Sequence, residues 1–402
     1  MEKLERELLQ EQISRARSEI LKYPEGMDGE TAMEIIENIV MDSGADLGLD
    51  GYSEAVRRVY AHTRSRLGML EPYIERDSIN EIMINGKDHI FLEDGGSMRQ
   101  LWGLFDTEEE LEEIIRNIAA GVHREINEMH PILDARLPDG SRVNAVYGNI
   151  AASGPVLTIR KFSKDRITIE QMVAGGTLTA ECAAYLRTLV RSGYNIFVSG
   201  GTSSGKTTFL NALSDFIPPD ERVIVIEDSR ELQLSGISNL VQLECHNANS
   251  MGQGQVSMEM LIKTSLRMRP DRIIVGEVRG REVADMLQAM NTGHDGSMST
   301  GHGNSVSGML RRLEAMYLMS AQIPMDAIRA QIVEGIDVMI HLGRLADGSR
   351  RVLEIQELVD FENGKYVLNP LFCLDGDRKL VSTGHDLINR SRLILKGCEL
   401  NG

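Results

Sequence analysis

The first part of the chain carries apolar residues among charged ones with a period of three to four. Two segments show this spacing, and their apolar positions are Leu4, Leu8, Ile13, Ala16 and Ile20 in one, and Ala32, Ile35, Ile36, Ile39 and Val40 in the other. A third segment of the same kind starts at Ser53. This period predicts amphipathic helices. We therefore expect residues 1–72 to form a helical bundle that serves as a docking or spacer piece.

Beyond this part the apolar pattern shortens toward a period of two, which is typical of half-buried strands. An Asn85-Gly86 turn separates two short apolar runs, and this dipeptide in that setting indicates a hairpin. Thr107, followed three residues later by Glu110, is the signature of a capped helix start. The predicted strands are residues 81–85, 89–93, 132–137, 142–147 and 156–162, and the predicted helix runs from 107 to 120. Together they predict a small α+β domain over residues 73–165.

The rest of the chain begins with a predicted linker and lead-in helix at residues 166–192. From residue 193 to residue 402, strand-like and helix-like segments alternate, which predicts an α/β layer with a largely parallel sheet. Two continuous apolar runs, residues 222–226 and 272–275, are typical of strands that are buried on both faces. Ligands of such sheets bind beyond the carboxyl ends of the strands, so chemistry is expected there.

A glycine-bounded loop follows the strand-like residues 195–199 and precedes a predicted helix at 206–216. It fits the pattern G-x-x-x-x-G-K-[ST] in the setting in which that pattern binds nucleoside triphosphates. Glycines let successive backbone N–H groups point at a phosphate, and the helix start adds positive potential. We expect Lys206 to reach the β- and γ-phosphates of ATP and the Thr207 hydroxyl to bind Mg²⁺. The predicted nucleotide-binding residues of the loop are Gly200, Gly201, Thr202, Ser203, Ser204, Gly205, Lys206, Thr207 and Thr208.

Acidic residues follow both buried apolar runs, at what we expect to be the same edge of the sheet. Glu227 comes directly after residues 222–226, and Glu277 follows residues 272–275. A carboxylate at that place can bind Mg²⁺, directly or through water, or orient the attacking water during ATP hydrolysis. Either glutamate can be the group that accepts the proton. For each one taken alone, the alternative is a satisfied strand-end carboxylate.

A polar loop at residues 291–305 is dense in Gly, Ser, Thr and His, with His294 and His302 eight residues apart. An imidazole can donate a hydrogen bond to a γ-phosphate, so a sensing role fits this loop. The alternative is that both histidines are structural or exposed. A metal site is not expected here, because the stretch offers too few ligands at suitable spacing.

Composition narrows the class of protein. With 402 residues and 42% hydrophobic content, the chain is long enough for two or three domains. Its formal net charge of −17 argues against broad nucleic-acid binding, which needs basic patches that displace counterions. The four cysteines lie far apart without a C-x-x-C pair, which favours a reducing compartment. No apolar run has the length of a membrane span and the first residues do not form a signal peptide, so we expect a cytoplasmic protein without direct membrane insertion.

Four boxes in order resemble the type II/IV secretion-system ATPases, and within them the CpaF family of tight-adherence (Flp) pilus motors. Residues 200–208 match the Walker A box, 225–232 are similar to the family's Asp box, 267–279 resemble its atypical Walker B box, and 292–302 match its His box. Upstream segments also look like the family, so the resemblance covers about residues 70–360. Ser203 stands where many members carry Gly. The four-cysteine zinc element of the type II secretion and type IVa pilus branch is absent, which favours the CpaF side.

The resemblance implies a RecA-like fold for the ATPase domain at residues 193–402, and it assigns roles near the loop. Glu227 would be the catalytic carboxylate, and Glu277 would position Mg²⁺ and water. Arg279 would belong to a relay near the site. His294 and His302 would sense phosphate.

The resemblance also changes the interpretation of two strand arginines, Arg142 and Arg160. Taken from the residues alone, solvated strand-edge charge is the favoured interpretation. In the family, however, arginines of the N-terminal domain close over the nucleotide. By that resemblance Arg142 and Arg160 are candidate clamps, and closure of one domain on the other would couple ATP state to movement.

By the same resemblance the chain is a hexameric motor that uses ATP and Mg²⁺. It would drive the assembly of a pilus, and possible tasks also include pilus retraction and protein secretion. Its expected partners are further copies of itself and an inner-membrane platform protein, with no specific nucleic acid. Two other functions stay open, a RecA-like ATPase that translocates nucleic acid and a nucleotide-gated scaffold. The net charge and the lack of an aromatic-rich basic groove count against the first. Retention of Lys206, Thr207, Glu227 and Glu277 counts against the second.

Overall fold

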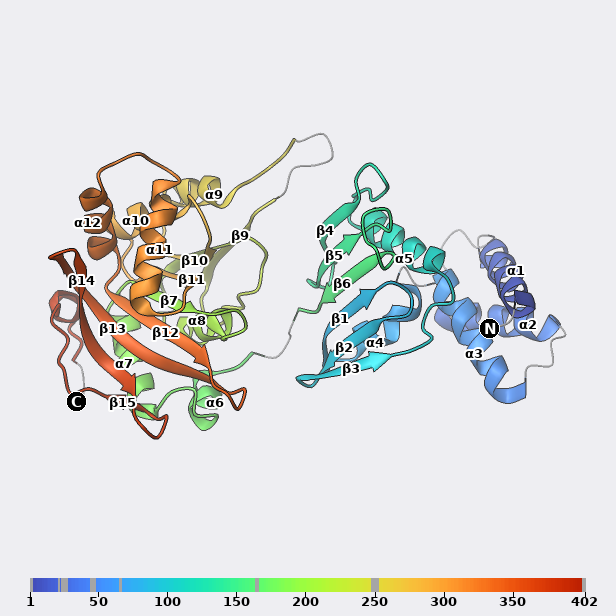
Figure 1. Cartoon of the computed structure of the whole chain (residues 1–402), viewed down its shortest axis with the longest axis horizontal. Helices are drawn as coiled ribbons and strands as arrows, with labels where there is room; N and C mark the ends of the chain where they lie inside the picture. Colours follow the sequence, from blue (N-terminus) through green and yellow to red (C-terminus); the bar gives the residue numbers. More distant parts are fainter. Residues whose placement is uncertain are drawn as a thin grey trace. The chain divides into compact units, whose positions relative to one another are not determined.

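The computed structural model of the chain describes residues 3–20, 22, 28–43, 48–64, 67–162, 166–246 and 253–399 (Figure 1). The chain divides into two compact units, residues 1–164 and 165–402. The first unit holds a group of helices and an antiparallel sheet, and the second holds a larger mixed sheet with helices on both faces. This is the α/β class that the sequence predicts, while the four-part domain division stays a prediction.

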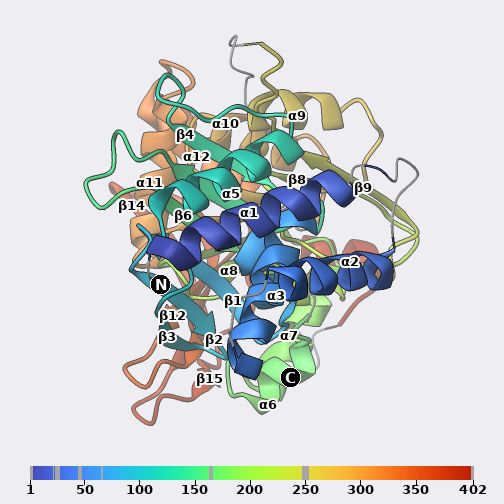
Figure 2. The ribbon, with the colours of Figure 1, turned by 90° about the vertical axis from the view of Figure 1, so that its right-hand side faces the viewer.

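Three helices at the start of the first unit pack against one another (Figure 2). They are α1 (Lys3–Ile20), α2 (Gly29–Asp42) and α3 (Gly48–Arg64). The buried side chains of Ile36, Val40 and Val59 lie in their common core. Asp28 caps α2, because its carboxylate accepts a hydrogen bond from Thr31 N–H at 2.7 Å. The segment therefore forms the helices that its apolar spacing predicts.

An antiparallel sheet of six strands follows, in the order β3-β2-β1-β6-β5-β4. Its strands are β1 (Ile79–Asn85), β2 (Ile90–Asp94), β3 (Ser97–Leu101), β4 (Ile132–Arg136), β5 (Arg142–Val146) and β6 (Val156–Arg160). The helical elements of this part are η1 (Gly68–Leu70), α4 (Glu71–Glu75) and α5 (Glu108–Gly121). Leu111 and Ile115 of α5 share a core with Ile82 and Ile159 of the sheet, so α5 covers one face.

Two local signals of this part form the structures that they predict. Gly86 turns the hairpin between β1 and β2 with a φ of 73°. Thr107 caps α5 by accepting from Glu110 N–H at 3.3 Å, and the Glu110 carboxylate in turn accepts from Asp106 N–H at 2.9 Å. Strand β3 has no counterpart in the sequence prediction, because its mostly exposed residues carry no apolar alternation.

The sheet of the second unit has nine strands in the order β15-β14-β13-β12-β7-β11-β10-β8-β9. The six strands from β12 to β9 are parallel, and the other three are antiparallel. The parallel strands are β7 (Ile196–Gly200), β8 (Arg222–Glu227), β9 (Asn239–Glu244), β10 (Arg272–Val278), β11 (Met298–His302) and β12 (Val338–Arg344). The antiparallel strands are β13 (Arg350–Glu362), β14 (Lys365–Leu374) and β15 (Leu380–Ser382). The parallel part agrees with the prediction, and the antiparallel extension adds to it.

Helices cover both faces of this sheet. Ile196 and Val198 of β7 lie in the core on one face, whereas Phe197 lies in the core on the other. The helices are α6 (Ile169–Ala174), α7 (Ala180–Arg191), α8 (Lys206–Ser214), α9 (Met258–Ser265), α10 (Val283–Asn291), α11 (Val306–Leu318), α12 (Met325–Gly335) and α13 (Ser391–Lys396). Among the described residues of the whole chain, no helix combines the length and the apolar character that crossing a bilayer requires.

The register of the parallel strands brings their carboxyl ends together. His302 at the end of β11 pairs with Gly200 at the end of β7, and Val275 of β10 pairs with Ile226 of β8. The loop after β7 therefore meets the ends of β8, β10 and β11 at one edge of the sheet, which we call the carboxyl edge. The opposite edge, where these strands begin, is the amino edge.

Candidate functional site

The loop after β7 has a backbone suited to binding an anion. Gly205 has a φ of 92° and stands at the start of α8, where the first helical N–H groups are available to a ligand. Gly200 has no room for a side chain, since an added Cβ would lie 2.7 Å from Leu342 O of β12. Ser203 has a left-handed backbone as well, with a φ of 57°. The loop therefore turns tightly at the carboxyl edge, as the glycine pattern predicts.

Lys206 is buried at the first position of α8, and its ammonium group lies against the loop. Nζ donates to Gly201 O at 3.0 Å and to Gly200 O at 3.3 Å, and it lies 3.3 Å from His302 Nδ1. An ammonium group can only donate, so His302 Nδ1 accepts, and a neutral ring then carries its hydrogen on Nε2. Burial lowers the pKa of Lys206, while the nearby Glu277 carboxylate opposes that change.

His302 connects this lysine to one of the two predicted carboxylates. His302 Nε2 lies 2.7 Å from Glu277 Oε1. Burial lowers the pKa of His302 below its ordinary value; Glu277 acts in the opposite direction, and the positive charges of Lys206 and Arg279 lower the pKa further. A neutral imidazole that accepts at Nδ1 carries its hydrogen at Nε2, the ring atom nearest Glu277, while the buried Glu277 Oε1 has no partner of good hydrogen-bond geometry among the described residues. We call Lys206, His302 and Glu277 the polar row.

Arg279 joins the polar row to solvent. Its Nη2 lies 2.8 Å from Glu277 Oε2, and its Nη1 lies 3.3 Å from Asp228 Oδ2. The hydrogen bond to Glu277 raises the pKa of Arg279. The side chain of Glu277 is 20% exposed and that of Arg279 is 57% exposed. A carboxylate in this setting is held in place and is still open to a cation or a water molecule.

Glu227 lies at the same edge but in more enclosed surroundings. The residue is 4% exposed, and its Oε1 accepts hydrogen bonds from Glu231 N–H and Leu232 N–H, both at 2.9 Å. Gly276 of β10 makes room for it, since an added Cβ there would lie 2.9 Å from Glu227 Cγ. One carboxylate oxygen of Glu227 therefore holds the turn that follows β8, and the two glutamates stand at the ends of adjacent strands.

The donor set fits a magnesium nucleotide. Thr207 follows Lys206 in the first turn of α8, and Glu277 stands at the end of β10. Hydroxyl and carboxylate oxygens are ligands that Mg²⁺ accepts together with water and phosphate oxygens. The other predicted loop residues are placed as follows: Gly201, Thr202 and Ser203 are exposed, Thr208 is half-buried, and Ser204 is buried.

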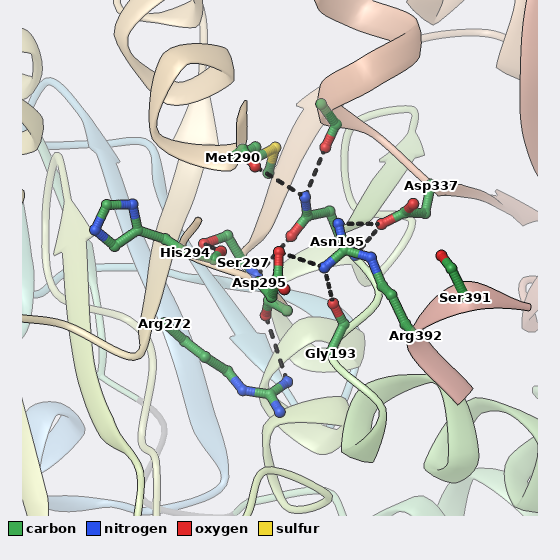
Figure 3. Close-up of polar contacts among 12 residues, drawn as sticks. Gly193, Asn195, Arg272, Met290, His294, Asp295, Ser297, Asp337, Ser391 and Arg392 are labelled. Atoms are coloured by element: carbon green, nitrogen blue, oxygen red, sulfur yellow. Dashed lines mark hydrogen bonds and ion pairs between the residues drawn. The ribbon is translucent and has the colours of Figure 1, made fainter. Parts of the chain in front are cut away.

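His294 lies away from the carboxyl edge. It precedes β11 and is drawn in Figure 3 beside the residues around Asn195. Its Nδ1 lies 3.1 Å from Ala289 O. Strand β11 begins at Met298, which pairs with Ile196 at the start of β7, so His294 belongs to the amino edge. Within this chain the structure does not bring His294 to the loop after β7, and its sensing role stays a prediction.

Arg142 and Arg160 lie in the first unit, directly opposite each other on β5 and β6. Arg136 of β4 is in turn opposite Arg142, so three arginines occupy successive strands in register. Like charges at directly opposing positions destabilise a sheet unless other groups compensate them, and Arg136 also donates to Gly140 O at 3.0 Å. The role of Arg142 and Arg160 as clamps stays a prediction.

Two residues near the loop were not singled out from the sequence. His341 of β12 is buried, and its Nδ1 lies 2.9 Å from the Oγ of Ser199, the residue that directly precedes Gly200 in the chain. Arg350 begins β13, and its Nε donates to Ser203 O at 3.2 Å. Both residues stand far along the chain from the loop, so no local pattern reports these contacts. The one available signal is a lone histidine within an apolar strand.

Known proteins resemble this chain over most of its length. The family model described as Type II/IV secretion system protein matches residues 63–363. The conjugal transfer protein TrbB of Rhizobium radiobacter is 34% identical over 293 residues, covering 72% of this chain and 86% of that protein. The type IV secretion system protein PtlH of Bordetella pertussis is 34% identical over 316 residues, covering 72% of this chain and 93% of that protein. The solved structure of the Legionella pneumophila ATPase DotB matches in fold, with a TM-score of 0.52 and 22% identity over 74% of this chain and 80% of that one.

Proposed function

This chain belongs to the type II/IV secretion system protein family, and from that membership we propose that it is a hexameric motor that hydrolyses ATP. The motor drives either the assembly of a type IV or Flp-type pilus or protein secretion, at the cytoplasmic face of the membrane. Retraction of the pilus is a further task that the proposal includes as an alternative. Solved structures of the same fold include the ATPase DotB, which supports the ATPase part of the proposal.

The polar row is the observation that carries the proposal. Lys206 Nζ donates to backbone carbonyls of its own loop, and bound phosphates offer stronger, charged acceptors for the same donor. His302 lies between this donor and Glu277, so a change at Lys206 on phosphate binding reaches the carboxylate through one imidazole ring. A scaffold that only binds nucleotide has no need of that connection.

Each residue near the loop has a distinct part in the proposed reaction. When bound, ATP supplies the phosphoryl group and Mg²⁺ compensates the charge on its oxygens. Lys206 binds the β- and γ-phosphates, Thr207 and Glu277 hold Mg²⁺, and Glu277 orients the attacking water. Glu227 is the second carboxylate, which serves as catalytic base or metal ligand. Arg279 keeps Glu277 in place.

The remaining roles have less support from a single chain. We propose that Arg142 and Arg160 close over the nucleotide and compensate charge in the transition state. Their alignment in register on β5 and β6 supports an anion-binding role. We also propose His294 as a phosphate sensor. This role has the least support, because His294 lies at the amino edge and not beside the loop after β7.

Membership of the family supports a proposal for the assembly and its setting. We propose a ring of six copies, docked on an inner-membrane platform protein and cytoplasmic apart from that contact, with no specific nucleic acid. Within the family, the four boxes and the missing zinc element favour the CpaF branch of tight-adherence pilus motors. The proposed parts of each copy are the helical bundle at 1–72, the α+β domain at 73–165, the linker at 166–192 and the RecA-like domain at 193–402.

Steady-state ATP hydrolysis per protomer, measured across a wide range of protein concentration, tests the motor. A rate that rises and then saturates supports a site that matures on assembly. The same assay with single-stranded and double-stranded DNA tests the alternative of a nucleic-acid motor, since the relative TrbB is named a conjugal transfer protein. Stimulation by DNA would favour that alternative.

The variant Glu277→Gln tests the chemistry at one residue. We expect it to bind ATP with wild-type affinity and to turn over at least a hundredfold more slowly, because the amide keeps the shape but loses the charge. Lys206→Ala serves as the contrasting variant, since it should lose nucleotide affinity itself. Wild-type turnover in Glu277→Gln would remove Glu277 from the proposed role.

A further inference from the structure

One residue of the phosphate loop adopts a backbone conformation that its side chain disfavours. Ser203 has a φ of 57°, in the left-handed region where glycine is at ease and a residue with a Cβ is strained. Gly205, two residues later, has a φ of 92° without such a conflict. The loop must keep Ser203 in this conformation if its N–H groups are to stay aimed at a phosphate.

Arg350 contacts the loop at this point. Its Nε donates a hydrogen bond to Ser203 O at 3.2 Å. Its aliphatic stem lies over Gly205, since Arg350 Cδ is 3.2 Å from where a Cβ on that glycine would be. The neighbouring strand β12 touches the start of the loop through Leu342 O, opposite Gly200. The hairpin of β12 and β13 therefore supports one side of the loop from Gly200 to Gly205.

We propose that Arg350 is a positioning residue that holds Ser203 in its left-handed conformation and keeps the loop ready for phosphate. The hydrogen bond fixes the direction of the Ser203 carbonyl, which sets the peptide plane shared with Ser204. A loop that is ordered before binding loses less conformational freedom when the ligand arrives, so affinity is higher. This role rests on the proposed nucleotide site and adds a residue outside the four boxes to it.

Arg344 provides a matched comparison within the same hairpin. It is directly opposite Arg350 in the register of β12 and β13, and both side chains are exposed. Arg344 Nε, however, donates to Gly348 O in the hairpin turn at 3.2 Å. Removing either arginine changes the charge of the hairpin equally, and only Arg350 holds Ser203.

A double-mutant cycle tests the proposal, with the dissociation constant of ADP measured by calorimetry on the full chain. Arg350→Ala should weaken ADP binding about tenfold, which is within the range of couplings between contacting residues. Ser203→Gly keeps the backbone N–H groups of the loop and adopts this φ without strain, so it provides the background in which Arg350 has no strain to oppose. In that background, adding Arg350→Ala should cost only about twofold. Arg344→Ala should bind ADP as the wild type does.

The outcomes separate the role of Arg350 from the nucleotide site itself. A tenfold loss from Arg350→Ala in both backgrounds, or no loss in either, would overturn the positioning role while ADP binding by the wild type keeps the proposed site. Absence of ADP binding by the wild type would overturn both. Arg350→Lys keeps the charge and lacks the Nε donor, so it should also weaken binding; wild-type affinity there would show that charge alone suffices and would contradict the proposal. Equal melting temperatures of the variants ensure that folding does not differ.

Discussion

The two edges of the nine-stranded sheet carry polar groups of the same kinds, but these groups differ in how completely their hydrogen bonds and charges are paired within the protein. At the carboxyl edge, Lys206, His302 and Glu277 form a row that opens to solvent at Arg279. At the amino edge, Asn195, Asp337 and Arg392 are joined to one another and to the backbone around them (Figure 3). Both edges bury charge, and only one of them leaves it within reach of a ligand.

Asn195 shows how complete the amino edge is. Its N–H donates to Asp337 Oδ2 at 2.7 Å, its Nδ2 donates to Gly335 O at 2.9 Å, and its Oδ1 accepts from Ser297 N–H at 3.0 Å. The side chain is fully buried. Gly335 and Asp337 lie just before β12 and Ser297 lies just before β11, so Asn195 ties the starts of β7, β11 and β12 together.

Arg392 brings the C-terminal segment into this network. Its Nη1 donates to Gly193 O at 2.6 Å and lies 2.6 Å from Asp295 Oδ1, and its Nη2 lies 3.2 Å from Asp337 Oδ2. The Tyr194 hydroxyl also donates to Asn389 O at 2.6 Å. The comparison teaches that a dense polar cluster is not a site by itself. At the amino edge the groups satisfy one another, whereas at the carboxyl edge the lysine donors are held by carbonyl groups that a phosphate can replace.

The largest expected effect is at the amino edge. Arg392→Ala should lower the free energy of unfolding by about 3 kcal/mol, because it leaves the nearly buried Asp337 without its cation. Urea unfolding measures the change. Arg390→Ala is the matched control, since Arg390 pairs with Asp386 on the surface and should change stability by about 0.5 kcal/mol or less. If Arg392→Ala lowered the free energy of unfolding as little as Arg390→Ala does, the contacts of Arg392 at the amino edge would not stabilise the fold.

The next effect is at the carboxyl edge and concerns rate. His302→Gln can keep a donor for Glu277, and His302→Asn can keep an acceptor for Lys206, but neither side chain bridges both. Each should lower kcat about thirtyfold, or about 2 kcal/mol, with little change in melting temperature. Steady-state ATP hydrolysis and thermal unfolding measure the two quantities. The exposed His385→Gln is the control; a melting temperature that falls in step with kcat would instead make His302 a structural residue.

The last expected effect, about as large as that at His302, is a pH dependence of stability. Burial raises the pKa of Asp337 to about 6 from an ordinary value of 3.8, although Arg392 and Asn195 N–H lower it and Asp295 and Glu357 raise it. Between these values the folded chain keeps a proton that the unfolded chain releases. The contribution of Asp337 to stability is therefore greatest below about pH 4 and declines as pH rises through 6.

The variant Asp337→Asn removes this titration and isolates it from the other carboxylates. From pH 4 to pH 7, the wild type should lose about 2 kcal/mol of unfolding free energy relative to Asp337→Asn. Urea unfolding at a series of pH values gives the difference directly. The exposed Asp386→Asn should follow the wild type throughout. A constant difference between wild type and Asp337→Asn across this range would mean that Asp337 has an ordinary pKa in the folded chain.

The sequence predicts the carboxyl edge well because its chemistry is local. The glycine pattern sets the turn after β7, and Glu227 and Glu277 follow apolar runs that can only be buried strands. Parallel strands then bring these ends together without any further information. The helices of residues 1–72 and the hairpin at Gly86 are predicted for the same reason, since spacing and turn chemistry act within a few residues.

The amino edge and the support of the loop could not be predicted in this way. Asn195 contacts Asp337, and Arg350 contacts Ser203, across more than a hundred residues of chain. Nothing in the neighbourhood of either residue distinguishes it from an ordinary polar side chain. The antiparallel strands β13 to β15 were missed for a related reason, because a partly exposed edge tolerates a weak apolar pattern.

The position of β7 also has a consequence for how the protein is made. This strand carries the phosphate loop, and its partners β11 (Met298–His302) and β12 (Val338–Arg344) both come later in the chain. On the ribosome, β7 therefore has no neighbour in the sheet until residue 302 has emerged, and its second neighbour is complete only at residue 344. Pairing across such long separations is slow compared with local folding. The growing chain thus completes the strands around its nucleotide site only after residue 344 has emerged, and ATP cannot assist the folding of what precedes them.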